Sequence, residues 1–564
     1  MAYNSKNLAE CFPPQTLNSL TMAPAIKSLL FKHPGLLFLL PYSALLIFLG
    51  LGDGTLQVDE GMDTFISTTI QKYGLPMHSD GVNTTMLFAD IYDGLFIYRT
   101  WVPYYLQAFS LSVFGNTTFA ARLPFALVGV ISVLSLYLLA LKLTGNKITA
   151  FLSALFLASS VPALIYFRTA RYVGFSILLT ILLIYFYLQI FDDKKWKTFP
   201  FIITAILFFH SMYVAFAGII LGILIHFLLH RKTIRADNAR MVPRCAAIIA
   251  CCTLPWLIAI APVFSNIAQF YIDSSDLVDT STLGWAKHFV GYLFQINNYI
   301  FPFIFLPLLF LKNLRPFKRQ IQLLVICILA LLIASSPHSI PLQQYVAAVF
   351  PLFYILLAMI LTLGFRKGVW PPLVLTAILI FTNLLHTGPL IPVKKFLQNH
   401  GGEFGQSPYL KYASTTFLRE VRLASMFQNH WYQITHPYHG PLDKIVEFFK
   451  NHPDAGQTCY IDNESESLAF HTGMKMIPAD ALDAGNPPDW IVLRGDQKNL
   501  DKTTPLKRKL QTLIESNPYR KIPLDAPAVR INNSYEIQIH RFRSPESSEK
   551  VIVYQRIKPA SANL

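Results

Sequence analysis

Ten long apolar runs dominate the first 388 residues of this 564-residue chain. A helix that crosses a bilayer needs about 20 predominantly apolar residues. Only 14% of the residues are charged, against roughly 25% in a soluble domain. These features exclude a soluble globular enzyme, a disordered protein and a fibrous one. The runs are Leu36–Leu51, Arg122–Leu143, Ile148–Phe167, Val173–Phe191, Phe199–Leu229, Met241–Phe264, Phe289–Leu311, Ile321–Ser335, Tyr345–Leu363 and Trp370–Thr387.

The basic residues between the runs predict the topology. Five clusters hold 16 of the 22 Lys and Arg residues between Leu36 and Gly388. If all five face the cytoplasm, an even number of crossings separates each pair, so Phe199–Leu229 must cross twice. This arrangement predicts about 11 spans, with residues 1–35 inside and the tail outside. The clusters are Lys142/Lys147, Asp192–Lys197, Arg231–Arg244, Lys312–Arg319 and Arg366/Lys367.

The net charge of +15 therefore reports membrane topology and contact with lipid headgroups, and no nucleic-acid partner is expected. We predict a multispanning α-helical membrane protein with a small C-terminal extracytoplasmic α/β domain. A transmembrane domain over residues 36–388 contains a first outer loop, 52–103. An amphipathic linker, 389–433, leads to the α/β domain, 434–564. The tail pattern predicts a helix at Pro441–Lys450 and strands at Thr458–Ile461, Trp490–Leu493, Tyr535–Phe542 and Val551–Arg556.

The first outer loop concentrates acidic residues. Asp59 and Glu60 lie just past the first span, and Asp63 follows four residues after Asp59, which places both aspartates on one face of a helix. Asp90 and Asp93 complete the loop. A carboxylate at the membrane surface can take a proton from an acceptor hydroxyl or amine as a bond to a sugar forms. The residues alone favour the alternative, a solvated loop with helix-capping acids.

Two arginines, Arg168 and Arg171, lie three residues apart between apolar runs and beside aromatic residues. Guanidinium groups bind phosphate in a bidentate manner, and a lipid phosphate would arrive at this depth. The alternative is that they extend towards the headgroups, and the residues leave the two interpretations balanced.

A third candidate region is the loop that contains His338 and leads into Gln344 and Tyr345. These three side chains are placed to face the same cavity. A lone histidine in a loop is more often a hydrogen-bonded surface residue, so the pattern favours that interpretation for His338.

In this order along the chain, these residues resemble the C-type (GT-C) membrane glycosyltransferases, of the type that includes dolichyl-phosphate-mannose protein mannosyltransferases and the bacterial enzymes that add aminoarabinose to lipid A. The resemblance covers about Leu36–Leu363. It is carried by Asp59-Glu60, by Tyr104–Gly115 with the following Phe119–Pro124, by Arg168–Tyr172, and by Tyr345 ahead of Pro351.

The resemblance implies a polyprenyl-phosphate-linked sugar donor and an acceptor glycan, lipid or protein on the outer face. It implies an inverting displacement with Asp59 as base, and Glu60 matches the family's second acidic position. Two departures matter: Tyr98-Arg99-Thr100 stands where some relatives have an acidic residue, and Gln344-Tyr345 stands where many have Arg-Tyr. The predicted phosphate ligands are therefore Arg171, then Arg168 and Arg99.

Asp93, Asp90, Tyr345, Gln344 and His338 are the residues predicted to position the acceptor. The cysteines show no metal-ligand spacing, no cofactor is assigned, and the resemblance leaves a divalent metal open. The expected location is a bacterial inner membrane, with the active site and the tail on the periplasmic side. The alternatives are a polytopic transporter or lipid flippase, which would carry ionisable residues near mid-bilayer, and a non-catalytic scaffold.

Overall fold

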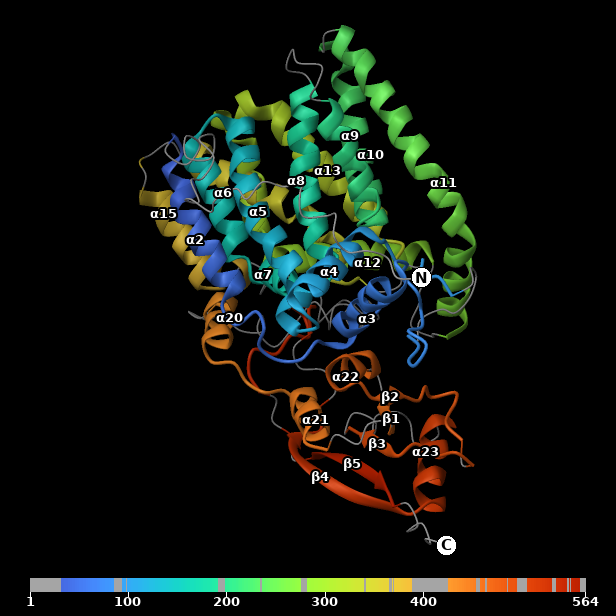
Figure 1. Cartoon of the computed structure of the whole chain (residues 1–564). Helices are drawn as coiled ribbons and strands as arrows, with labels where there is room; N and C mark the ends of the chain where they lie inside the picture. Colours follow the sequence, from blue (N-terminus) through green and yellow to red (C-terminus); the bar gives the residue numbers. More distant parts are fainter. Residues whose placement is uncertain are drawn as a thin grey trace, which may run out of the picture.

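The computed structural model of the chain describes residues 32–557, apart from the following positions: 86–93, 98, 191–197, 234–235, 275–280, 339–340, 365–367, 369, 388–424, 453–456, 462–463, 484, 495–504, 530–533, 545–546 and 548. The predicted candidates Asp90 and Asp93 and most of the predicted linker lie outside the described residues. Figure 1 shows a helical bundle joined to a smaller domain that contains a sheet.

The bundle is built from the apolar runs. Within the described residues, six helices are long and apolar enough to span a membrane, or eight spans result if each of two sharply bent helix pairs counts as one. The long helices and segments are α5 (Thr118–Thr144), α8 (Val173–Ile190), α10 (Tyr213–His230), α11 (Ala236–Ser274), α13 (Lys318–Ser335) with η4 (Lys312–Phe317), and α14 (Phe350–Met359) with η5 (Gln343–Val349) and η6 (Ile360–Gly364). The bent pairs are α6 (Lys147–Ser159) with α7 (Val161–Arg168), and α12 (Thr282–Tyr299) with η3 (Phe303–Phe310).

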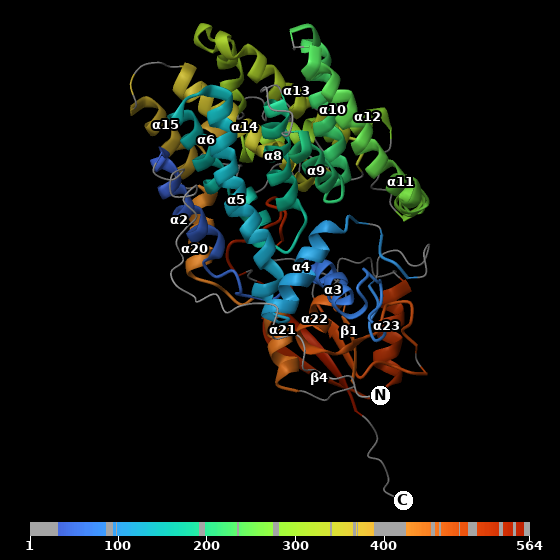
Figure 2. The same cartoon turned by 45° about the horizontal axis from the view of Figure 1, so that its top comes forward.

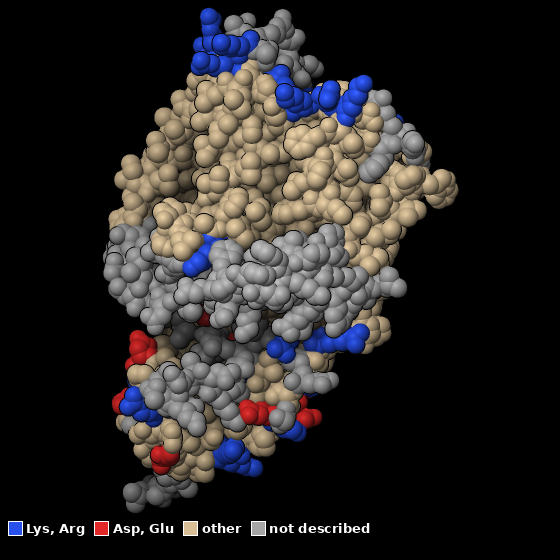
Figure 3. Space-filling view, turned by 180° about the vertical axis from the view of Figure 1, so that it is seen from behind, with Lys and Arg blue, Asp and Glu red and all other residues tan. Residues whose placement is uncertain are grey.

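Three further apolar helices, α2 (Pro34–Phe48), α9 (Thr198–Phe209) and α15 (Trp370–Phe381), are shorter and lie within the remaining predicted runs. The long run Phe199–Leu229 is divided between α9 and α10, as the positions of the basic clusters required. Seen from behind, Lys and Arg side chains gather at the end of the bundle farthest from the C-terminal domain (Figure 3). The described residues thus form a multispanning helical membrane protein.

The first outer loop folds into helix α3 (Val58–Tyr73), and helix α4 (Val102–Phe114) follows it. Figures 1 and 2 place both helices between the bundle and the C-terminal domain. The start of α3 is capped, because the Glu60 carboxylate accepts a hydrogen bond from the Gln57 amide (3.2 Å). The helix ends at Gly74, whose φ of 75° is the left-handed conformation that favours glycine.

The C-terminal domain contains a five-stranded sheet in the order β2-β1-β3-β5-β4. Its strands are β1 (Thr458–Ile461), β2 (Lys475–Met476), β3 (Trp490–Leu493), β4 (Tyr519–Pro527) and β5 (Lys550–Arg556). Its helices are α21 (Pro441–Lys450), α22 (Ser465–Thr472) and α23 (Pro505–Ser516), and α20 (Met426–Thr435) precedes them. β1 pairs in parallel with β2 and β3, whereas β5 is antiparallel to β3 and β4.

One predicted strand is wrong. Tyr535–Phe542 forms turns rather than a strand, and Ile537 is buried in the core of the helical bundle. The alternation of residue types along this segment resembles a strand. Its partners, however, are helices of the membrane domain and not the sheet.

The two domains make direct contacts at α3. Helix α22 lies against it, and the Ser467 hydroxyl donates to the Gln57 carbonyl (3.1 Å). A Cβ atom at Gly61 would lie 2.8 Å from the Ser467 backbone nitrogen, so the close approach requires glycine. The preceding loop is also bound, since the Thr55 amide donates to Asp443 (2.6 Å) and the Leu56 amide to His471 (3.1 Å).

Candidate active site

Two carboxylates one helical turn apart on α3, Asp59 and Asp63, face Arg171. The Arg171 guanidinium lies 2.8 Å from Asp63 and 3.5 Å from Asp59. Arg171 follows α7 in the short turn before α8, which brings it back over α3. The predicted pairing of the first-loop aspartate with this turn is therefore present in the structure.

Arg99, from the segment before α4, contacts the same two carboxylates. Its guanidinium lies 2.5 Å from Asp63 and 3.9 Å from Asp59. The Tyr104 hydroxyl also donates to Asp63 (2.9 Å). Asp63 is thus enclosed by three donors with its side chain 1% exposed, whereas 27% of the Asp59 side chain is exposed. Asp63 holds the two arginines in place, and Asp59 is the more exposed of the two carboxylates.

The surroundings of Asp59 keep it ionised. Burial acts to raise the pKa of the Asp59 carboxyl, but Arg171, Arg99 and the Tyr535 hydroxyl outweigh burial and lower it below its ordinary value. An ionised carboxylate beside two guanidinium groups is the charge arrangement needed to accept a proton next to a bound phosphate.

The C-terminal domain contributes two side chains that the sequence analysis did not identify. The Tyr535 hydroxyl donates to Asp59, and the Arg171 guanidinium lies 4.6 Å from the centre of the Tyr535 ring. The neighbouring Glu536 carboxylate accepts from the backbone amides of Gln343 (3.1 Å) and Gln344 (3.3 Å). Burial raises the pKa of Glu536 to about 8. No local sequence motif identifies these two residues, because their partners lie in other parts of the chain.

Gln344 lies at this site, and its side-chain oxygen accepts from Arg171 (3.4 Å). The rings of His338 and Tyr345 stack with centroids 3.7 Å apart, and the Tyr345 carbonyl accepts from the Ser335 hydroxyl (3.1 Å). The predicted residues of this loop are therefore near one another. The structure joins Gln344 directly to the arginine and aspartate cluster.

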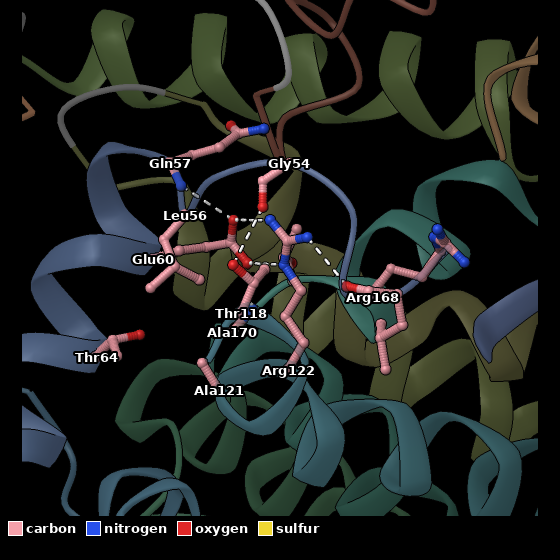
Figure 4. Close-up of polar contacts among 12 residues, drawn as sticks. Gly54, Leu56, Gln57, Glu60, Thr64, Thr118, Ala121, Arg122, Arg168 and Ala170 are labelled. Atoms are coloured by element: carbon pink, nitrogen blue, oxygen red, sulfur yellow. Dashed lines mark hydrogen bonds and ion pairs between the residues drawn. The ribbon is translucent and has the colours of Figure 1, made fainter. Parts of the chain in front are cut away.

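Glu60 lies elsewhere, although it follows Asp59 directly. It is fully buried and forms a double ion pair with Arg122 of α5, with both N–O distances 2.9 Å (Figure 4). It also accepts from the Ala170 amide (2.7 Å). Because neighbouring residues on a helix point about 100° apart, Glu60 joins α3 to α5 and to the turn that carries Arg171. These contacts describe a positioning residue.

Arg168 also points away from Asp59. Its guanidinium donates to the carbonyls of Leu46, Ile47, Leu49 and Gly50 at distances between 2.7 and 3.3 Å. Leu46 and Ile47 belong to the last turn of α2, where carbonyls have no partner within the helix, and Leu49 and Gly50 follow directly after the helix. Figure 4 shows the guanidinium directed away from the Glu60–Arg122 pair. Of the two arginines in the motif, only Arg171 contacts the acidic pair.

No group of three His, Cys, Asp or Glu side chains that could hold a metal ion occurs among the described residues. Asp90 and Asp93 are outside that set.

Comparisons with known proteins find a matching family model and a shared fold. Residues 99–259 match the family model of dolichyl-phosphate-mannose-protein mannosyltransferases. The apo crystal structure of ArnT from Cupriavidus metallidurans matches 84% of this chain and 96% of its own, with a TM-score of 0.55 and 15% identity. The chain has the fold of ArnT.

Other GT-C structures show weaker similarity. ArnT from the same organism bound to undecaprenyl phosphate has a TM-score of 0.49 and 13% identity over 94% of this chain and 98% of its own. The oligosaccharyltransferase of Archaeoglobus fulgidus in the apo form has a TM-score of 0.47 and 13% identity over 88% of this chain and 75% of its own. No curated protein sequence matches the chain directly.

Proposed function

We propose that this protein is a GT-C glycosyltransferase that transfers a sugar from a polyprenyl-phosphate-linked donor to an acceptor at the outer face of the membrane, with Asp59 as the base. One observation carries the proposal. Asp59 is a partly exposed carboxylate with Arg171 and Arg99 within 4 Å, and it lies on α3, the helix between the apolar bundle and the C-terminal domain (Figure 1).

Arg171 and Arg99 supply the positive charge for the leaving phosphate. Guanidinium groups suit phosphate oxygens because their donors form a planar fork. ArnT, which shares this fold, has also been crystallised with undecaprenyl phosphate, and we use this lipid in the tests below. Arg168 is left out of the phosphate site, because its donors are directed to the end of α2.

The chemical step is an inverting displacement. The acceptor oxygen forms a bond to the anomeric carbon, and its proton passes to Asp59. The bond between that carbon and the phosphate oxygen breaks, and the lipid phosphate leaves with the electron pair. A bound phosphate shares the arginines with Asp59, which raises the basicity of the carboxylate when the proton has to be accepted.

The acceptor would approach from the side of the C-terminal domain. Gln344, Tyr345 and His338 lie on the segment beside Arg171, and we propose that they position the acceptor together with Asp93 or Asp90. The site and the tail would face the periplasm of a bacterial inner membrane, with the basic end of the bundle in the cytoplasm. A transporter is disfavoured, because α3, which carries Asp59 and Asp63, lies between the bundle and the C-terminal domain and not midway along the spans (Figure 1).

Purified protein in nanodiscs, supplied with a panel of undecaprenyl-phosphate sugars and acceptors, tests this function. Asp59→Asn should reduce transfer by about 10² to 10⁴, the usual contribution of a general base, and the product should have the inverted anomeric configuration. Glu447→Gln is the matched control, because Glu447 is an exposed carboxylate in the C-terminal domain. Transfer by Asp59→Asn within threefold of wild type would rule out Asp59 as the base.

A further inference from the structure

The contacts of Tyr535 and Glu536 resemble those that the two substrates would make. Tyr535 presents a hydroxyl group to Asp59 as a hydrogen-bond donor. An acceptor hydroxyl has to be within hydrogen-bond reach of the base before it can lose its proton. The two residues come from a turn 476 positions farther along the chain, so this contact is not a consequence of local helix geometry.

Glu536 presents a carboxyl group to a second set of donors, which lies beside Arg171. Its two carboxylate oxygens accept from the backbone amides of Gln343 (3.1 Å) and Gln344 (3.3 Å). Arg171 donates to the Gln344 side chain next to them (3.4 Å). Successive backbone amides beside a guanidinium group form an anion-binding site, and this one lies within the reach of the cation that is proposed to hold the donor phosphate.

We propose that Tyr535 and Glu536 fill the two substrate subsites when the enzyme is empty. The Tyr535 hydroxyl occupies the position of the acceptor hydroxyl at Asp59. The Glu536 carboxylate occupies the position of the donor phosphate at the Gln343 and Gln344 amides. This inference rests on the proposed function and extends it, since it assigns a hydroxyl as the acceptor's nucleophile and names the groups that bind the phosphate.

The backbone of the turn is held in place. Ile537 is buried in the bundle core, and the His540 ring bonds to the Ser534 carbonyl (2.5 Å) and to Gln433 (3.0 Å). These contacts hold the turn on both sides of Glu536. We therefore infer that the substrates compete with the side chains of Tyr535 and Glu536 and not with a whole domain.

Donor binding tests the inference. Undecaprenyl phosphate is titrated into the full chain in nanodiscs, and the bound fraction is measured by native mass spectrometry. Glu536→Ala should lower Kd by about tenfold, because the carboxyl group that competes for the two amides is gone. Glu536→Gln, which keeps the side-chain volume, should give a smaller decrease. Tyr535→Phe should leave Kd within twofold, because its hydroxyl lies at Asp59 and not at the amides. Glu447→Ala is the matched loss of an exposed carboxylate and should leave Kd unchanged.

The possible outcomes separate the two proposals. A Kd for Glu536→Ala equal to or weaker than that of wild type overturns the inference, and the Glu536→Gln variant guards against a folding defect. If the lipid binds wild type and Arg171→Lys weakens it, the proposed donor class stands even when the inference fails. If undecaprenyl phosphate binds to none of the variants, the proposed function and the inference are both overturned.

The rate of sugar transfer to a small hydroxyl compound tests the part of the inference that concerns Tyr535. With undecaprenyl-phosphate sugars as donors and glycerol as the hydroxyl probe, Tyr535→Phe should increase transfer to glycerol by about three- to tenfold, because a small hydroxyl then replaces the phenol at Asp59. A rate that decreases would show that Tyr535 assists Asp59, and would overturn this part of the inference.

Discussion

Arg171 and Asp63 form an ion pair of 2.8 Å in which both side chains are only 1% exposed. A buried guanidinium is costly unless its charge is compensated. Asp63 supplies that compensation and leaves the more exposed Asp59 available to a substrate. The proposed base is therefore positioned by a second carboxylate one helical turn away.

Two substitutions of Arg171 should separate its role in sugar transfer from its contribution to the stability of the fold. Arg171→Lys keeps the positive charge but loses the fork that contacts Asp59 and Asp63, so we expect transfer to decrease at least tenfold with a folded protein. Arg171→Met leaves Asp63 buried without this partner and should lower the free energy of unfolding by about 3–5 kcal/mol. Transfer assays and thermal unfolding check both effects. Full activity in Arg171→Lys would contradict a role for the fork.

Glu60 should behave differently from Asp59. Glu60→Gln leaves Arg122 without its buried counter-charge and should cost about 3–5 kcal/mol of unfolding free energy. The double variant Glu60→Gln/Arg122→Met should recover part of that stability, because no charge is then left alone. Chemical denaturation of wild type, Glu60→Gln and the double variant measures how much unfolding free energy is lost and recovered. A stable Glu60→Gln protein with lost transfer would instead indicate a direct role in the reaction.

Substitution of Arg168 tests the prediction that both Arg168 and Arg171 bind the donor phosphate. Because its guanidinium bonds to the end of α2, Arg168→Met should lower the melting temperature and leave the Kd for undecaprenyl phosphate within threefold of wild type. Arg171→Lys measured in the same titration is the positive control. A weakening of tenfold or more in Arg168→Met would return this residue to the phosphate site.

Lipid affinity should depend on pH through Glu536. Burial raises the pKa of Glu536 to about 8 from 4.5, so the docked side chain is favoured in its protonated form. Its docking is strongest below about pH 4.5 and weakens as the pH rises through 8. Wild type should therefore gain affinity for undecaprenyl phosphate relative to Glu536→Gln between about pH 5 and 8.

The comparison with Glu536→Gln removes the titration of the lipid itself, which is the same in both proteins. Asp59 and Arg171 act on Glu536 in the opposite sense to each other, and both are present in each variant. Equal pH profiles would show that Glu536 does not compete with the lipid.

Gly61 should be needed for the domains to dock. Gly61→Ala introduces a Cβ atom 2.8 Å from the Ser467 backbone nitrogen, so we expect α22 to separate from α3 and transfer to decrease. Gly291→Ala is the control, because the nearest atom to its added Cβ lies 3.6 Å away on Pro341. Limited proteolysis of the C-terminal domain reports docking. Unchanged protection in Gly61→Ala would contradict the contact.

Local sequence patterns were sufficient to predict the helical bundle and about half of the residues that meet at the candidate site. A span is specified by about 20 neighbouring residues, so the runs and their basic loops predicted the helices, including the division of Phe199–Leu229 into α9 and α10. The four-residue spacing of Asp59 and Asp63 predicted a shared face, since helix geometry is local. The proximity of this face to Arg171 followed from the expected order of the spans.

Only the tertiary structure shows which partner each site residue contacts. Asp59 and Glu60 are adjacent carboxylates with the same chemistry. They point in different directions on α3, so Asp59 pairs with Arg171 and Glu60 pairs with Arg122. Arg168 and Arg171 differ in the same way. Tyr535 and Glu536 reach the site from a distant domain, in a segment that reads as a strand. Long-range contacts depend on how whole elements pack, and that information is not contained in any short stretch of residues.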